Sequence, residues 1–500
     1  MDEDHRALHH QTLNILVDKL QLVHRELQGV RDRDGAKQSD DVDPGPGSTA
    51  NRIKYAFRKK RTDEAIDQLE SWQGVFDISW FLTLKIASRH IDEALGDSPV
   101  SRISSTMPPT TRLRAVIRRR APEPVMTHVL SPAGEESGIF LRGDGLAGAI
   151  ITPLPFCSGS SISVAVRKQE EGQLLILDRI ECTDPAVIRT VTKDVRSLAL
   201  NMRDAAGSGA DSFGWLRCKG VVKEVLPTTG EEMTPSPPLT TSLTMVFKVP
   251  SGYQAPMSLR AALLQGDECL GSLSDKVKLA RDLAHAVSYM HIFGFVHKNI
   301  RPETVLLLHD GSVPTTAGTP LSLFLVGFER FRSEEGITYR AGDQEWVKTL
   351  YRHPRRQGLR PADTYVMQHD IYSLGACLLE IGLWESFVRY EDTGHQVSGL
   401  GTALQHSTGS AAGANSSVAV LPSNTQAFLL ARAENELPKR MGTKYAEVVK
   451  TCLTCLDPAN KDFGDESEFE DGDGIVVGVK YVEKVLQYKS PSYRPVSLTC

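Results

Sequence analysis

The stretch VHKNIRPETVLLL, residues 296–308, is the most informative part of this chain. The residues before it, 274–294, repeat apolar side chains at helical spacing, which predicts an amphipathic helix with one buried face. That face comprises Val277, Ala280, Leu283, Ala284 and Val287. The sequence therefore predicts a helix, then a polar loop, then an apolar run.

The polar loop resembles the catalytic loop H-R-D-L-x-x-x-N of eukaryotic protein kinases. His297 matches the motif's His, and Pro302 keeps its spacing. The general base of that motif is replaced by Asn299, its Lys by Arg301 and its metal-binding Asn by Thr304. The resemblance implies a kinase-like loop that lacks the groups for phosphoryl transfer.

Three downstream segments extend the resemblance. LFLVGFERF (323–331) is similar to the strand and turn that carry D-F-G, with Gly327 at the Mg²⁺-binding Asp and Glu329 at the Gly. QHDIYSLGACLLEIGLW (368–384) resembles the helix that begins D-x-W-S-x-G, and Asp370 matches its Asp. LYRHPRR (350–356) resembles the end of an activation segment. The resemblance gives His297 and Asp370 architectural roles.

The replaced positions are the ones that carry the chemistry. Phosphoryl transfer depends on positioning, on the Asp that accepts the substrate proton and on the Mg²⁺ ligands. The amide of Asn299 cannot take up that proton, and Gly327 has no group that can ligate a metal. We therefore do not expect bound Mg²⁺, and Glu329 is the one candidate for a substitute ligand.

The nucleotide-binding positions leave alternatives open. Gly143, Gly145 and Gly148 spell G-x-G-x-x-G, which is either a phosphate-cradling loop or an ordinary β-turn. The nucleotide-binding Lys has two candidate positions, Arg167 in SVAVRKQ and Arg179 in LLILDRIE, and the hairpin spacing favours Arg179. LTMVFKVPSG (243–252) resembles the hinge, with Phe247 at the inner gate and Lys248 and Val249 at the adenine edge. ATP binding without turnover is compatible with this pattern.

Composition shifts predict the domain organisation. Residues 1–97 have helical periodicity typical of a helical hairpin or small bundle, and residues 98–134 form a Ser, Pro and Arg rich, flexible basic linker. Residues 135–495 are expected to have an α+β, bilobal protein kinase-like fold. Its small β lobe with one helix would span 135–252, its large helical lobe 253–495, and a Gly, Ser and Ala rich disordered insertion 391–424.

The combination of HKNIRPET, VGFE and YRHP is similar to divergent kinase-like domains of filamentous fungi. Residues 51–86 resemble the helical N-terminal domains of fungal death-signalling and NTPase-sensor (STAND-type) proteins, including the HeLo-like group. A helical bundle joined to a pseudokinase is also the layout of the animal mixed-lineage-kinase-domain-like protein.

Composition narrows the class of protein. A net charge of -5 and 40% hydrophobic residues are ordinary values, and the chain has no overall excess of positive charge, so no nucleic-acid partner is expected. Eight scattered cysteines favour a reducing compartment, and Cys452 and Cys455 form a CxxC that is either part of a core helix or a metal or redox pair. A cytoplasmic protein is expected, the nucleus being the alternative, because neither a signal peptide nor an apolar span is recognisable.

Three hypotheses about function follow. The leading one is a signalling pseudokinase, a binding module that controls the N-terminal helices through protein partners or self-association, with ATP as the one cofactor considered. The second is a weakly active atypical serine/threonine protein kinase, and the third is a relic with only an assembly role. Lys and Arg runs, such as 58–61 and 118–120, allow contact with anionic membranes as a further hypothesis.

Overall fold

The computed structural model describes residues 138–142, 146–157, 161–167, 173–182, 187–205, 214–225, 240–266, 272–311, 321–333, 345–358, 363–391, 397–400 and 425–464, with 481 and 485. Strands and helices are both abundant in these ranges, so the expected α+β class is confirmed. The predicted helical domain (1–97) and basic linker (98–134) lie outside the described residues.

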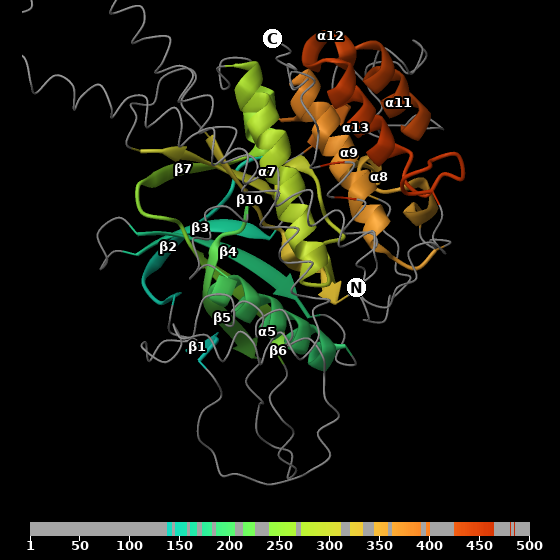
Figure 1. Cartoon of the computed structure of the whole chain (residues 1–500). Coiled ribbons are helices and arrows are strands. Elements are labelled where there is room, and N and C mark those ends of the chain that lie inside the picture. The colour runs from blue at the N-terminus through green and yellow to red at the C-terminus, as the bar shows by residue number, and fades with distance from the viewer. Residues whose placement is uncertain are drawn as a thin grey trace, which may run out of the picture. The chain divides into compact units, whose positions relative to one another are not determined.

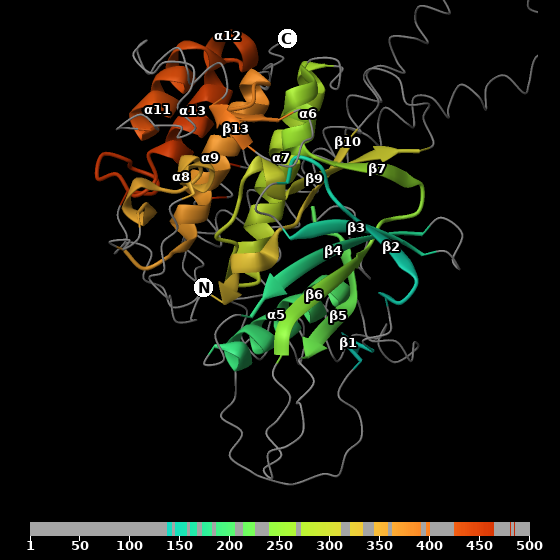
Figure 2. The same ribbon diagram turned by 180° about the vertical axis from the view of Figure 1, so that it is seen from behind.

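Six strands form the largest sheet, in the order β1-β5-β6-β4-β3-β2. They are β1 (Phe140–Leu141), β2 (Ala149–Pro153), β3 (Ile162–Arg167), β4 (Leu174–Glu181), β5 (Arg217–Val225) and β6 (Thr240–Lys248). Helix α5 (Ile188–Ala205) packs against β5 and β6 (Figures 1 and 2). Its buried side chains recur at helical spacing, which is how an amphipathic helix covers a sheet. They are Val195, Leu198, Ala199 and Met202.

A three-stranded sheet, in the order β10-β9-β7, positions the segments that matter most below. It consists of β7 (Tyr253–Ser258), β9 (Val305–Asp310) and β10 (Leu321–Leu325). Because Val305 lies opposite Leu325 in the antiparallel pair, the residues just before β9 lie beside those just after β10. The loop 297–304 is thereby brought against Gly327. Two short strands, β8 (Phe295–Val296) and β11 (Arg332–Ser333), pair across the same region.

The remaining elements are mostly helical. They are α6 (Leu259–Gln265), α7 (Leu273–Ile292), α8 (Trp346–Leu350), α9 (Met367–Leu383), α11 (Thr425–Asn435), α12 (Leu437–Met441) and α13 (Thr443–Leu453), with 3₁₀ turns η5 (Pro302–Thr304), η6 (Phe328–Arg330) and η7 (Pro354–Arg356). Every residue of α9 is buried, and it packs against both α7 and α13. A helix that is apolar on nearly all sides belongs inside a protein, and α9 is the centre of this part.

Two expectations about local structure need correction. Val277 was expected on the buried face of α7, but its side chain is 47% exposed, as is that of Leu273 one turn earlier at 53%. The first turns of α7 therefore project beyond the core, and burial becomes continuous only from Leu283 onward. Within the predicted disordered insertion 391–424, Val397–Leu400 forms strand β13, which pairs with β12 (Val388–Tyr390). The other residues of that insertion, except Glu391, lie outside the described part.

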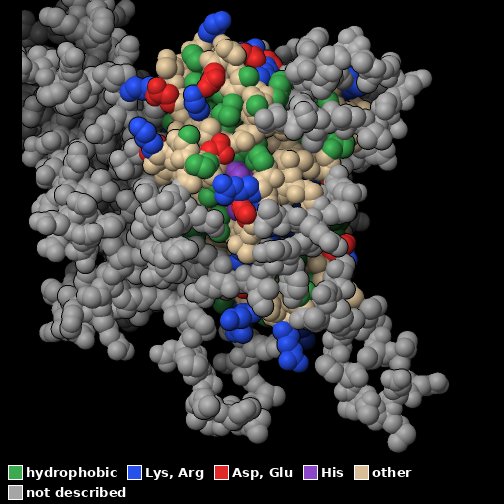
Figure 3. Space-filling model, turned by 90° about the vertical axis from the view of Figure 1, so that its right-hand side faces the viewer, with side chains coloured by type: hydrophobic (Ala, Val, Ile, Leu, Met, Phe, Trp, Pro, Cys, Tyr) green, Lys and Arg blue, Asp and Glu red, His purple; other side chains and the backbone are tan. Residues whose placement is uncertain are grey.

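The surface and the cysteines test other predictions. No helix in the described residues is long and apolar enough to cross a membrane. Figure 3 shows Lys and Arg side chains mixed with Asp and Glu on the coloured face, which agrees with ion pairs such as Arg432–Glu436 and Arg440–Glu385.

Cys452 lies in the last turn of α13 and Cys455 follows this helix, and both are fully buried. Their surroundings agree with the core-helix alternative.

Candidate functional site

The loop 297–304 is held by one carboxylate of the central helix α9. Asp370 accepts hydrogen bonds from the backbone N–H groups of His297 at 2.7 Å and Lys298 at 2.9 Å. Lys298 has φ +64°, a left-handed conformation that a side chain disfavours, so these bonds stabilise an otherwise costly turn. Tyr365 Oη also donates to Asp370, at 2.6 Å. Asp370 thus has the architectural role that its match to the motif implied.

The surroundings of Asp370 favour its charged form. Burial alone would raise its pKa, but the hydrogen bond and charge of His291, with His297 and Tyr365, hold the pKa below its ordinary value. His297 Nε2 lies 3.1 Å from the carbonyl oxygen of Val326, and its ring centroid is 5.1 Å from that of Phe328. Burial lowers the pKa of His297 to about 4, so its imidazole is neutral and packs rather than titrates near neutral pH.

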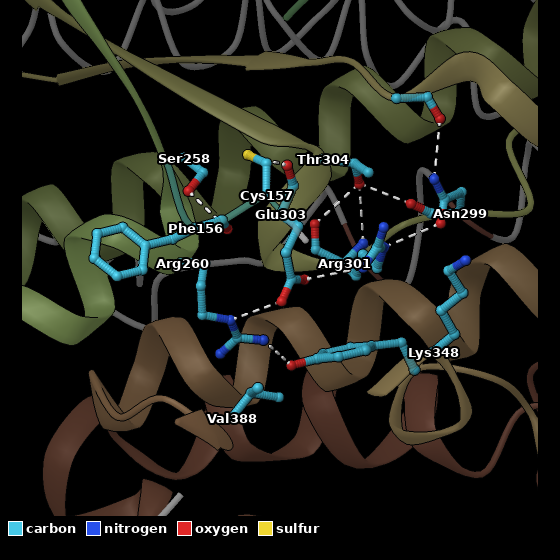
Figure 4. Close-up of polar contacts among 12 residues, drawn as sticks. Phe156, Cys157, Ser258, Arg260, Asn299, Arg301, Glu303, Thr304, Lys348 and Val388 are labelled. Carbon is cyan, nitrogen blue, oxygen red and sulfur yellow. Dashed lines mark hydrogen bonds and ion pairs between the residues drawn. The ribbon is translucent and has the colours of Figure 1, made fainter. Parts of the chain in front are cut away.

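The three replaced loop positions lie together and satisfy one another (Figure 4). Asn299 Nδ2 donates to the carbonyl oxygen of Gly327 and to Glu329 Oε1, both at 3.2 Å, and Asn299 Oδ1 accepts from Arg301 Nε at 3.1 Å. Thr304 Oγ1 donates to the carbonyl oxygen of Asn299 at 2.7 Å. Both ends of the Asn299 amide are therefore used inside the protein.

Gly327 and Thr304 fit each other in volume. Gly327 has φ +85°, and a Cβ atom at this position would lie 2.3 Å from Cγ2 and 2.7 Å from Cβ of Thr304. Real Cβ atoms essentially never approach other heavy atoms so closely, and left-handed backbone disfavours a side chain in any case. The space that a carboxylate at position 327 would enter is filled by the Thr304 side chain.

A metal ion does not fit this arrangement. Mg²⁺ in phosphoryl-transfer sites is bound by one or two carboxylates together with substrate phosphates in octahedral geometry. Gly327 and Thr304 supply no carboxylate, and the carboxylate of Glu329 already accepts a hydrogen bond from Asn299. Within the described part of the chain, no group of three or more His, Cys, Asp or Glu side chains is placed to hold a metal ion.

Asp178, a residue that the sequence did not indicate, faces this site from β4. Its fully buried Oδ2 accepts the backbone N–H groups of Gly327 at 2.7 Å and Phe328 at 2.8 Å, and Ser161 Oγ donates to its Oδ1 at 3.3 Å. Burial, with a smaller contribution from the nearby Glu329, raises the pKa of Asp178 to about 6, although the hydrogen bonds from Phe328 and Gly327 act in the opposite direction.

Arg179 is the neighbour of Asp178 and points the other way. Successive strand residues face opposite sides of a sheet. The Arg179 guanidinium is exposed and pairs with Glu224 at 2.9 Å. The assignment of Arg179 to the nucleotide-binding Lys position is therefore corrected, because the residue beside Gly327 is an acid, Asp178.

Gly148 and Arg167 also lie away from this region. Gly143 and Gly145 are outside the described residues, and Gly148 is an exposed turn residue with φ +76° directly before β2. Ala149 pairs with Arg167, whereas the other end of β3, at Ile162, pairs with Asp178. Gly148 and Arg167 thus share the end of the hairpin that is remote from Asp178, and the geometry gives neither a place in the site.

The predicted hinge residues have separate positions. Phe247 is fully buried, and its ring centroid is 6.0 Å from that of Phe328, so it borders the site. Lys248 is half-buried and pairs with Leu175 across the sheet. The N–H of Val249 donates to the carbonyl oxygen of Leu174 at 3.2 Å. That backbone donor is thus engaged in the protein rather than directed at a ligand.

A buried ion network supports the loop from below (Figure 4). Arg260 at the start of α6 bonds Glu303 through Nε at 3.0 Å and Glu380 of α9 through Nη1 at 2.6 Å, and all three side chains are fully buried. Tyr351 Oη accepts from Arg260 Nη2 and donates to Glu380 Oε2 at 2.7 Å. Arg301 lies 3.8 Å from Glu303, so two cations balance two carboxylates. The network ties α6, η5 and α9 into one rigid support.

Comparisons with known proteins do not assign this chain to a family. No protein-family model matches the chain, and no curated protein matches it at a significant level.

Proposed function

We propose that residues 135–495 form a bilobal protein kinase-like domain that has lost phosphoryl transfer and acts as a signalling or binding module, a pseudokinase. The fold supports this proposal through the strand order β5-β6-β4-β3-β2, with α5 after β4 and a mostly helical part after β6. The contacts of the loop 297–304 with Asp370 and with the turn at Gly327 also support the proposal.

One observation carries the loss of catalysis. The Thr304 side chain fills the volume beside Gly327 in which a metal-binding carboxylate would project. The charge of Asp178 points to the same conclusion, because a buried carboxylate beside the turn opposes the approach of a polyphosphate where a kinase would offer an ammonium group. The protein groups in the site satisfy one another, so the arrangement is suited to binding and conformational change rather than turnover.

Mg²⁺-ATP does not fit these residues. Adenine recognition needs only backbone groups and apolar walls, so binding of a nucleotide without metal is the form of ATP binding that this proposal allows. The proposed partners are other proteins or further copies of this chain, contacted through the N-terminal helices expected in residues 1–97.

The test is phosphoryl transfer by the full chain. The protein is incubated with γ-labelled ATP and Mg²⁺ or Mn²⁺, with casein and the chain itself as acceptors. We expect no label above background, because a missing general base alone costs roughly 10² to 10⁴ in rate. Transfer that disappears in Asn299→Ala would refute the proposal and favour a weakly active atypical kinase. Loss of the same transfer in Glu329→Gln would identify Glu329 as a substitute metal ligand.

Thermal denaturation with millimolar ATP distinguishes the forms of binding, since a ligand of the native state stabilises it by RT ln(1 + [L]/Kd). We expect no Mg²⁺-dependent shift. A metal-independent shift would identify a nucleotide-binding pseudokinase, and no shift at all would leave a module that recognises only macromolecules. Co-sedimentation of the full chain with anionic vesicles, compared with neutral ones, tests the proposed membrane contact of the basic segments.

A further inference from the structure

The connection between β2 and β3 leaves its own sheet and packs against the helical part. Strand β2 is largely exposed, whereas Leu154 and Cys157, just beyond it, are only 5% and 7% exposed. Phe156 between them has φ +55°, a left-handed backbone that a Phe adopts only when its surroundings hold it there. Residues 154–157, called the strap below, therefore take an imposed conformation.

Three separate contacts hold the strap. Cys157 Sγ donates to the carbonyl oxygen of Glu303 at 3.2 Å, within the turn that follows the Asn299 loop (Figure 4). Ser258 Oγ donates to the carbonyl oxygens of Phe156 at 3.4 Å and Pro155 at 3.5 Å. The same hydroxyl accepts the N–H of Ala261 and so caps α6.

The third contact is aromatic. The ring of Phe156 meets Tyr390 of β12 edge-on, with centroids 5.5 Å apart. Tyr390 Oη in turn donates to Glu303 Oε1 at 3.1 Å. The strap thus touches β12, η5 and the cap of α6, all of which belong to the support of the candidate site.

The far end of the same connection is also tied to the site. Ser161 donates to Asp178, and Asp178 holds the backbone of Gly327 and Phe328. The connection therefore links the six-stranded sheet to both sides of the site, to Glu303 at one end and through Asp178 to Gly327 at the other.

These contacts are of the kind that can open. A thiol is a weak donor, the Ser258 bonds are long and shared, and an edge-on ring pair is a modest contact. None of the three is an ion pair, in contrast to the Arg260 network directly beneath.

We propose that the strap Leu154–Cys157 is an autoinhibitory closure, seated in this structure, whose release uncovers the Glu303 side of the candidate site for a binding partner while Asp178 still holds Gly327 to the six-stranded sheet. This regulatory role rests on the proposed function as a binding module.

The wild-type full chain offers a direct test through its own thiols. Cys157 and Cys377 are both buried, but Cys377 lies in the middle of α9 and reacts only when the central core unfolds. N-ethylmaleimide labelling under native conditions, followed by mass spectrometry, compares the two. We expect Cys157 to be labelled faster than Cys377 on the order of tenfold or more, because local opening needs less free energy than global unfolding. Equal rates would overturn the proposal.

Variants locate the effect. Phe156→Ala removes the ring contact and should accelerate Cys157 labelling and amide hydrogen exchange in residues 299–305, with no change in α9. Ile151→Ala, at a 49% exposed position on the adjoining β2, is the matched control and should leave both unchanged. Phe156→Leu keeps an apolar side chain and serves if the alanine variant does not fold. Exchange that rises equally in α9, or not at all, would show that residues 154–157 are ordinary core.

These measurements use neither nucleotide nor phosphoryl transfer. If the labelling and exchange results contradict the role of the strap, the proposed loss of catalysis still stands. Detected phosphoryl transfer would refute the proposed pseudokinase function and leave the labelling and exchange results unaffected.

Discussion

The substitution Asp178→Asn removes a fully buried titratable group from the candidate site. Burial raises the pKa of Asp178 from 3.8 to about 6, so in the folded protein it keeps its proton at pH values where the unfolded chain has lost it. Between these two pKa values the native state binds more protons, and stability falls as pH rises. The contribution of Asp178 is fully present below its unfolded pKa and is lost as the pH rises through about 6. Asparagine has the same shape and does not titrate.

The magnitude follows from the two pKa values. The full difference of about two units is worth about 3 kcal/mol, and roughly 1.4 kcal/mol of it is lost between about pH 5 and about pH 7.5. Asp178 is fully buried, so solvent screening does not reduce this figure appreciably. The free energy of unfolding of wild type minus that of Asp178→Asn should therefore decrease by roughly 1.4 kcal/mol over this range.

Urea unfolding followed by circular dichroism measures this difference at each pH. Subtracting the variant removes the contributions of other carboxyl groups, such as Asp370, whose pKa is shifted downward and whose stabilisation is lost toward acid pH. A flat difference for Asp178→Asn, or one that grows with pH, would refute the placement of this carboxylate in a buried site.

Three other substitutions test the geometry through their free energies of unfolding. Gly327→Asp, which restores the sequence of a metal-binding turn, should lower the free energy of unfolding by about 3 to 5 kcal/mol, because of the clash with Thr304 and the left-handed backbone. Gly327→Ala introduces the same clash without the charge. Wild-type stability in both variants would contradict the packing of Gly327 against Thr304. Arg260→Met should cost about 3 to 5 kcal/mol because Glu303 and Glu380 lose their buried partner, and a loss under about 1 kcal/mol would argue against the network. Arg179→Ala should change stability by less than about 1 kcal/mol, since its pair with Glu224 is 45% and 47% exposed, and a larger loss would mean that Arg179 has an interior role.

Much of the fold could be predicted from periodicity. The strands of the predicted small β lobe and the helix α7 lie where their apolar patterns indicated, and α9 lies where the resemblance to the D-x-W-S-x-G helix predicted a helix. Asp370 and His297 were recognisable because each belongs to a short motif, although the N–H of His297 and the Asp370 carboxylate that accepts it are 73 residues apart.

The error at Arg179 has a physical cause. In LLILDRIE, Leu175, Ile176 and Leu177 are all buried, so the first half of the strand shows no alternation, and burial alternates only in the last four residues, from Asp178 to Glu181. A shift of one residue exchanges the two faces of a strand. Which of Asp178 and Arg179 faces the site is decided by pairing with β6, where Asp178 lies opposite Met245, and that contact is distant in sequence.

The pattern G-x-G-x-x-G left a phosphate-cradling loop and an ordinary β-turn open for a different reason. It specifies a flexible backbone but not its place in a sheet, and its last glycine, Gly148, lies directly before β2, a strand that the sequence did not indicate. The connection that reaches the site is the next one along, and it contains Pro155 and Phe156 rather than paired glycines. Its closeness to Glu303 spans 146 residues of sequence and could come only from the tertiary structure.

The replaced residues form a connected set rather than separate losses. Thr304 fills the space beside Gly327, Asn299 bonds the Gly327 carbonyl, and Asp178 bonds the Gly327 N–H, so one glycine is held from three sides. A phosphoryl-transfer site gathers carboxylates that repel one another until a metal ion binds, whereas here the side chains of Asn299, Thr304 and Asp178 each have internal partners. Such a site gains little stability from a cation and is ordered without one. In the proposed binding module, a binding signal therefore acts on contacts at the edge of the site, such as those of Phe156 and Cys157.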